Sequence, residues 1–164
     1  MYHGLIKQNN QLKVWSLKTN EFVFAFGETG KKIGQFMEPS YCAIFNKDPS
    51  GSLMLAVSDS MNHRIQILKV DTEPSFKITA VRSIGKEGTS LGQLINPRGI
   101  CFDQNGALLV ADAGNKRLQL FSIRDGSPIC LVAAKQGIIP EALSITSEME
   151  IIVTDRKQHL IYIF

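Results

Sequence analysis

The chain has 164 residues, 44% of them hydrophobic and 20% charged, with a formal net charge of +3, a composition ordinary for a soluble globular protein. No apolar run reaches the roughly 18 residues of a membrane helix, and the first residues lack the apolar core of a signal peptide. These features lead us to expect a cytoplasmic protein with no membrane contact. The charge is too small to establish a nucleic-acid partner by itself.

Read from its start, the chain opens on a partial copy of a unit that then recurs. Residues 9–15 (Asn-Asn-Gln-Leu-Lys-Val-Trp) align with residues 62–68. The first full unit starts with a glycine-rich lead-in, residues 26–39, which contains Gly34-Gln35-Phe36 and ends at Pro39. Its core follows as Asp59-x-x-Asn62-x-Arg64-Ile65-Gln66. Such internal similarity indicates a repeat protein, whose period identifies the fold.

The second full unit repeats both parts in the same order. Its lead-in, residues 84–97, lies 58 residues after the first, and its core lies 53 residues after the first core. Extra sequence before Asp59, in residues 46–52, accounts for the difference. The second core reads Asp112-x-x-Asn115-x-Arg117-Leu118-Gln119.

A third, fainter copy follows. Pro140 and Asp155 lie 43 residues beyond Pro97 and Asp112. The glycine-rich lead-in has shrunk to Lys135-Gln136-Gly137, while Gln158 replaces the Asn and Leu160 replaces the Arg of the core.

Each unit contains short apolar runs bounded by turn residues. In the second unit these runs are residues 99–102, 107–111, 117–121 and 129–132, and Asn105-Gly106 is a tight-hairpin signal. No helical periodicity competes with them. Four short strands roughly every 43 residues are typical of a β-propeller blade, so the pattern predicts an all-β fold in which Pro39, Pro97 and Pro140 each start an inner strand.

The pattern resembles the NHL repeat, both in its G-x-x-G-x-x-x-G-Q lead-in followed by proline and in its V-A-D-x-x-N-x-R core, best matched by residues 110–119. The resemblance implies an NHL-type β-propeller of about three and a half four-stranded blades: a remnant at 4–26, blades at 39–84 and 97–134, and a partial blade at 140–164. NHL propellers are usually six-bladed rings. The ring is therefore expected to be incomplete, and to need missing blades or a second copy to close.

If the strands of a blade are lettered A to D outward from the ring centre, the D-to-A and B-to-C loops open on one face. We call this the loop face, and it gathers as much excess positive charge as the whole chain. A basic face favours phosphates or acidic protein surfaces. Its candidate binding residues are Tyr41, His63, Arg64, Arg98, Lys116, Arg156, Lys157 and His159.

A structural role competes with binding at several of these positions. The Asp, Asn and Arg of the repeat recur because they build the turn, and most of them, Arg64 and Arg117 included, are expected to be structural. Positions that vary between units, such as Ser40, Arg98 and Glu141 after each proline, are better candidates for binding. Tyr41 stands where the second unit has Gly99, and it suits a packed aromatic ring as well as a binding one.

An enzyme is the third hypothesis. Some NHL-like propellers are lyases with metal-binding histidines just after the proline, but here those places hold Ser40, Arg98 and Glu141. His63 and His159 occupy equivalent turns two blades apart, too far for one zinc ion. The three cysteines, Cys42, Cys101 and Cys130, are expected to be small buried residues, with a Cys42–Cys101 pair left open.

We therefore predict a non-catalytic recognition platform without a cofactor. The resemblance implies binding of protein partners, as in the substrate-recognition part of RING-type ubiquitin ligases, although no RING sequence is present in this chain. Binding of RNA through the basic loop face is the alternative, and a metal-dependent lyase-like enzyme is a less favoured one.

Overall fold

A computed structural model describes residues 5–6, 9–45, 52–71, 76–133 and 137–164. Residue 4 of the expected blade remnant, most of the extra sequence at 46–52, and residues 134–136 around the shortened lead-in lie outside the described residues. The described part of the chain contains no α-helix and is built from strands and short 3₁₀ turns. No helix within it is long and apolar enough to cross a bilayer.

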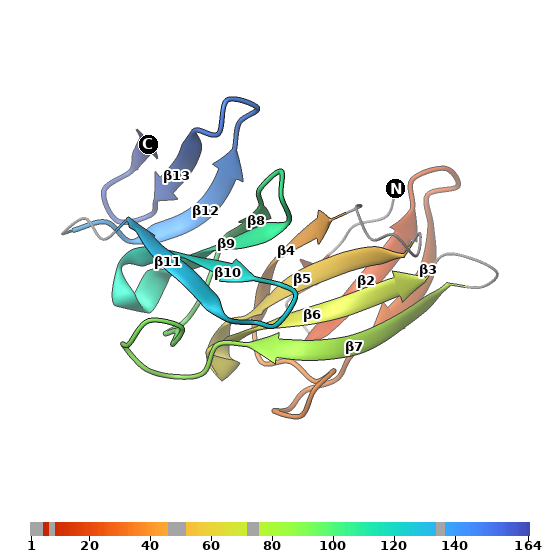
Figure 1. The fold of residues 1–164 in the computed structure, drawn as a ribbon. Helices are drawn as coiled ribbons and strands as arrows, with labels where there is room; N and C mark the ends of the chain where they lie inside the picture. Colours follow the sequence, from red (N-terminus) through yellow and green to blue (C-terminus); the bar gives the residue numbers. More distant parts are fainter. Residues whose placement is uncertain (1–4, 7–8, 46–51, 72–75, 134–136) are drawn as a thin grey trace.

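The strands form four antiparallel sheets among the described residues (Figure 1). The first holds β1 (Leu5–Ile6), β2 (Gln11–Ser16) and β3 (Glu21–Phe26), and the second holds β4 (Pro39–Phe45), β5 (Leu53–Asp59), β6 (Arg64–Asp71) and β7 (Lys77–Ile84). The third holds β8 (Ile100–Phe102), β9 (Ala107–Asp112), β10 (Arg117–Ser122) and β11 (Pro128–Ala133), and the fourth holds β12 (Pro140–Ile145), β13 (Ile151–Asp155) and β14 (Leu160–Ile163).

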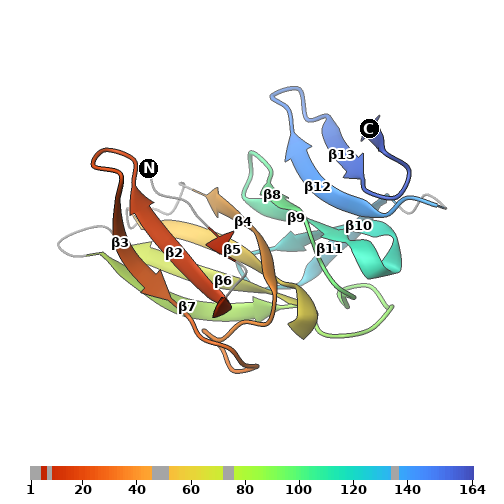
Figure 2. The same cartoon turned by 180° about the vertical axis from the view of Figure 1, so that it is seen from behind.

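The sheets are successive blades of a propeller, as predicted. In the second and third sheets the strands follow chain order from inner to outer, and β4, β8 and β12 lie side by side on the inner side (Figures 1 and 2). Because β3 leads through the first lead-in loop to the inner strand β4, the first sheet supplies strands B to D of its blade. The fourth sheet supplies strands A to C. The predicted fold of about three and a half blades in an incomplete ring is confirmed.

The core lies between neighbouring blades. Each strand alternates its side chains between the two faces of its sheet. The faces that neighbouring sheets turn toward each other meet in three apolar clusters. Val14 and Leu68 belong to the first cluster, between the first and second sheets. Ile67 and Phe121 belong to the next, between the second and third sheets. Burial of apolar surface between blades therefore fixes the spacing of the loops that each blade carries.

Two of the three predicted strand starts are confirmed, since β4 begins at Pro39 and β12 at Pro140. The third is wrong, because β8 begins at Ile100 and not at Pro97. The backbone N–H of Gly99 donates to the carbonyl oxygen of Glu141 in the next blade (2.8 Å). A β-carbon at Gly99 would lie 2.7 Å from that oxygen, so only glycine allows the two inner strands to approach this closely.

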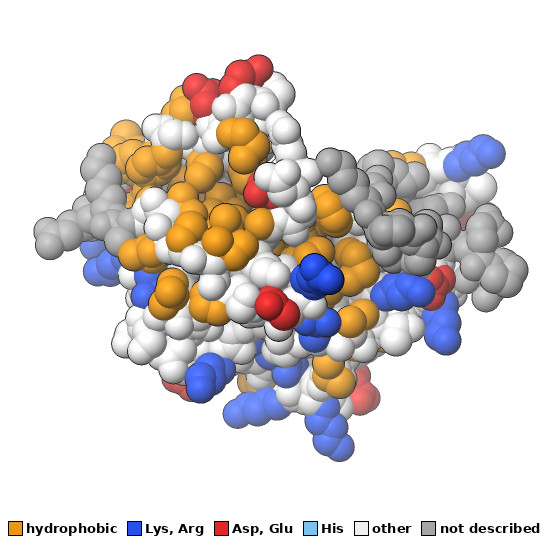
Figure 3. Space-filling model, in the orientation of Figure 1, with side chains coloured by type: hydrophobic (Ala, Val, Ile, Leu, Met, Phe, Trp, Pro, Cys, Tyr) orange, Lys and Arg blue, Asp and Glu red, His pale blue; other side chains and the backbone are white. Residues whose placement is uncertain are grey.

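The outermost strands expose apolar side chains. Ile161 and Ile163 of β14 are 68% and 65% exposed, and Ile129 and Leu131 of β11 are about half exposed; Figure 3 shows hydrophobic side chains gathered over this end of the molecule. The three cysteines are free. Cys130 is exposed, so its expected burial was wrong, because β11 is an outer strand whose free side faces solvent. The need for a second copy or further blades stays a prediction.

Candidate functional site

The loop face is organised around the buried carboxylates of the repeat. Asp59, at the end of β5, is fully buried. One carboxylate oxygen accepts a hydrogen bond from the backbone N–H of Met37 (2.7 Å), and the other accepts from Asn62 (2.9 Å), Arg64 (2.7 Å) and Gln66 (3.0 Å). A carboxylate with this many donors holds the turn and the preceding lead-in loop together.

Arg64 extends this network into the lead-in loop. Beyond its bond to Asp59, its guanidinium donates to the carbonyl oxygens of Lys31 (2.7 Å), Lys32 (2.8 Å) and Gln35 (2.9 Å). Gln66 accepts from the N–H of Gly34 (2.8 Å). The planar fork of arginine suits several fixed carbonyl oxygens at once, so Arg64 is committed to holding this loop.

The second unit repeats the arrangement bond for bond. The carboxylate of Asp112 accepts from the N–H of Ile95 and from Asn115, Arg117 and Gln119, all at 2.8 or 2.9 Å. The guanidinium of Arg117 donates to three carbonyl oxygens of its lead-in loop, those of Thr89, Ser90 and Gln93. The expectation that the repeated Asp, Asn and Arg build the turn is confirmed.

A second contact joins the first blade to the second and the second to the third. The residues just before β2, β6 and β10 adopt a left-handed conformation, with φ of 51° at Asn10, 53° at His63 and 56° at Lys116. Asn10 accepts a hydrogen bond from the N–H of Glu38 (2.8 Å), and Nδ1 of His63 accepts one from the N–H of Asn96 (3.0 Å). We call this contact the latch. It requires a side-chain acceptor, which the ammonium group of Lys116 lacks.

A cluster at the inner end of the loop face brings three of the predicted residues together. The hydroxyl of Tyr41, from β4, donates to Glu141 of β12 at 3.3 Å. Burial, and then the nearby carboxylate of Glu141, raise the pKa of Tyr41, while the positive charges of Arg98 and Arg156 oppose the shift. We call these four residues the inner cluster. The cluster joins the second and fourth blades across Gly99 of the third blade.

The other predicted residues are distributed along the same face. His63 lies against the lead-in loop of the third blade, with Nε2 4.0 Å from a carboxylate oxygen of Glu87. The side chains of Lys116, Lys157 and His159 are exposed. In Figure 3, lysine and arginine side chains are frequent along the lower part of the molecule, where Figure 1 places the lead-in loops.

Glu141 was named as a better candidate for binding because it is a variable position after a proline, equivalent to Ser40 and Arg98, but its contact with Tyr41 was not predicted. That equivalence was the one available signal, since no local pattern pairs residues that are 100 positions apart. Among the described residues, no group of three or more His, Cys, Asp and Glu side chains is arranged to hold a metal ion.

Comparisons with known proteins agree with this architecture. Residues 94–121 match the family model of the NHL repeat. A stretch of 47 residues is 47% identical to protein lin-41 of Caenorhabditis elegans, covering 29% of this chain and 4% of lin-41.

Two solved structures share the fold at low sequence identity. One is that of a nidogen/laminin complex (TM-score 0.65, 20% identity, 94% of this chain and 52% of the other). Another is a catalytically inactive virginiamycin B lyase from Staphylococcus aureus with quinupristin (TM-score 0.59, 16% identity, 94% and 48%). The chain spans about half the length of these structures. Their likeness shows the fold and carries no activity over to this chain.

Proposed function

We propose that this chain, which carries an NHL repeat on a β-propeller scaffold, is a recognition platform that binds protein partners through its loop face. The observation that carries the proposal is a division of roles between neighbouring residues. The guanidinium groups of Arg64 and Arg117 donate hydrogen bonds to the carbonyl oxygens of the lead-in loops. Lys116 is exposed beside Arg117 on the same rigid turn. Because the loop backbone is already held in place, binding does not have to order it.

The charge of the free side chains indicates the chemistry of the partner. Arg98, Lys116, Arg156 and Lys157 are cations on the loop face that the repeat network does not use. Glu141 lies near Arg98 and Arg156, and the acids Glu38 and Glu87 are exposed in the lead-in loops. Positive groups on a preformed face steer acidic surfaces toward it and select against basic ones. We therefore expect an acidic protein segment as the partner. In the setting of a RING-type ubiquitin ligase, this binding would choose the substrate, and the chain itself would transfer nothing.

The test removes two cations from the face without touching the network. The double variant R98E/K116E changes two loop positions whose side chains do not hold the lead-in loops, and urea unfolding checks that a glutamate at position 98, near Glu141, leaves the fold intact. Proteins captured from cell extract on the wild type are purified, and their affinities for the wild type and for the variant are measured directly. We expect at least tenfold weaker binding by the variant. Equal affinity of both chains for every captured partner would reject the proposal.

RNA is the second candidate, and the same four cations are the observation that favours it. If phosphates are the ligand, affinity for a labelled single-stranded RNA should fall steeply between 50 and 200 mM salt, and R98E/K116E should abolish it. RNA binding that is undetectable at 50 mM salt, or that the double variant leaves unchanged, removes this candidate and leaves protein recognition.

A further inference from the structure

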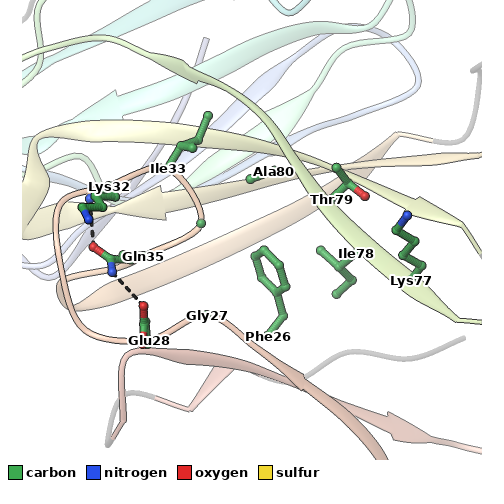
Figure 4. A pocket seen from close by; sticks show the side chains of 11 residues that line it. Phe26, Gly27, Glu28, Lys32, Ile33, Gln35, Lys77, Ile78, Thr79 and Ala80 are labelled. Carbon is green, nitrogen blue, oxygen red and sulfur yellow. Dashed lines mark hydrogen bonds between the residues drawn. The ribbon is translucent and has the colours of Figure 1, made fainter.

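A groove lined by none of Arg98, Lys116, Arg156 and Lys157 lies between the outer strands of the first two blades (Figure 4). It is wide open to solvent and has a volume of about 760 Å³. Phe26 at the end of β3 forms one side, residues 77–80 of β7 form the other, and the first lead-in loop closes one end. The repeat network holds Lys32, Gly34 and Gln35 of this loop through their backbone groups, and no residue of the inner cluster lines the groove.

The groove has an apolar floor and a charged rim. Phe26, Ile78 and Ala80 belong to the apolar cluster between the two blades, and Ile33 of the loop, 52% exposed, also lines the groove. Lys32 and Lys77 are exposed, one from the loop and one from β7. Glu28 is the single acid that lines the groove, and its carboxylate already accepts a hydrogen bond from Gln35 (2.7 Å). The lining therefore carries a net charge of +1.

Both strands that border the groove have an unpaired edge. Within the described residues, β7 pairs only with β6, and β3 pairs only with β2. A free edge offers backbone N–H and C=O groups to an added strand. An extended peptide is the ligand that satisfies such groups, while alternate side chains of the peptide reach the groove floor.

The next junction shows what closes such a groove. In the second blade, Leu68 of β6 pairs with Ala80 of β7. In the third blade, the equivalent residue is Phe121 of β10, and it pairs with Pro128 of β11. A β-carbon built on Gly92 would lie 2.9 Å from Pro128, but one built on Gly34 would lie 3.7 Å from Ala80. In addition, β7 begins at Lys77, before Ala80, whereas β11 begins at Pro128 itself, so β7 is the longer strand at this end. A small residue and a longer outer strand therefore leave space at this junction that Pro128 occupies at the next.

We propose that this groove binds an extended segment of a partner protein that carries an apolar side chain flanked by acidic residues. The segment adds a strand to the free edge of β7, places its apolar side chain over Phe26 and Ala80, and brings carboxylates to Lys32 and Lys77. The inference is independent of the proposed function of the loop face, because none of the four cations Arg98, Lys116, Arg156 and Lys157 lines the groove.

The experiment measures binding of a fluorescein-labelled peptide of sequence EELTVEE to the full chain by anisotropy. Two variants test the groove: Ala80→Leu fills the floor, and K32E/K77E reverses the rim. Lys18, exposed in the turn between β2 and β3, supplies the matched charge control K18E. We expect each groove variant to weaken binding at least tenfold and K18E to leave it within twofold. R98E/K116E should also leave it unchanged, which separates this site from the loop face.

Two further peptides make the result decisive. A KKLTVKK peptide tests the charge rule, and an EELTVEE peptide with methylated backbone nitrogens tests strand addition; both should bind at least tenfold more weakly. Urea unfolding of each variant checks that the fold is intact. Loss of binding in K32E/K77E with an unchanged unfolding midpoint supports the site. Equal affinity for the acidic and basic peptides, or binding that neither groove variant changes, would overturn it.

Discussion

The turns of the third and fourth blades hold the same aspartate in different ways. Asp112 is fully buried and bonds to the side chains of Asn115, Arg117 and Gln119. Asp155 instead accepts the backbone N–H groups of Ile139, Lys157 and Gln158 at 2.8 to 2.9 Å.

The difference follows from Leu160, which stands where Arg117 stands and is half exposed. With the arginine the repeat ties a long lead-in loop to the turn, whereas without it the aspartate closes only its own turn and a short connection. The presence of the arginine therefore decides whether the lead-in loop is tied to the turn.

Removing the carboxylate is expected to give the largest difference between the two turns in the free energy of unfolding. Asp112→Ala leaves the mostly buried guanidinium of Arg117 without its counter-charge, and breaking a buried ion pair in this way costs about 3–5 kcal/mol. Asp155→Ala removes an acceptor from backbone groups at the edge of the fold, and should cost about 1–2 kcal/mol. Urea unfolding followed by circular dichroism measures both. Equal losses would mean that the arginine contributes nothing to the third turn.

A smaller effect is expected at the latch between blades. His63→Ala removes the acceptor of the Asn96 N–H and should lower the free energy of unfolding by about 1 kcal/mol. His63→Asn should restore most of it, because Asn10 performs the same role in the preceding blade. Lys116→Ala has no latch to lose and should stay within about 0.5 kcal/mol of the wild type. If the asparagine variant is as unstable as the alanine variant, the latch is not the cause.

The smallest effect concerns pH. Burial tends to raise the pKa of Asp155, but the hydrogen bonds from Gln158, Ile139 and Lys157 outweigh it and lower the pKa. A carboxyl whose folded pKa is depressed adds stability above its unfolded pKa, about 3.9, and loses that stability as the pH falls through the folded value. Asp155→Asn should therefore lose less stability than the wild type between pH 5 and pH 2 in urea titrations. Parallel pH profiles would contradict this assignment.

Much of the fold follows from the sequence, because each blade repeats its own local signals. The repeated prolines and Asp-x-x-Asn-x-Arg cores predicted a β-propeller and identified the residues that build its turns. The start of β8 could not be predicted, since it depends on the contact of Gly99 with Glu141 in the neighbouring blade.

The candidate site was predictable only in part, for the same reason. Arg98 and Lys116 stand out as variable positions within the repeat. The pairing of Tyr41 with Glu141 joins two blades, and the groove beside Ala80 depends on the length of β7. Neither is encoded by a local pattern, because both arise from how blades pack against one another.

The central claim is that the repeat residues hold the loop face while the residues between them bind. Its most direct test compares two neighbours, Lys116→Glu and Arg117→Ala, by measuring partner affinity and unfolding free energy on the same samples. We predict that Lys116→Glu weakens partner binding at least tenfold and changes stability by no more than about 0.5 kcal/mol. Arg117→Ala should cost at least about 2 kcal/mol, because it leaves Asp112 buried without its cation. If Lys116→Glu destabilises the fold as much as Arg117→Ala does, or leaves binding intact, the division of roles on the loop face is wrong.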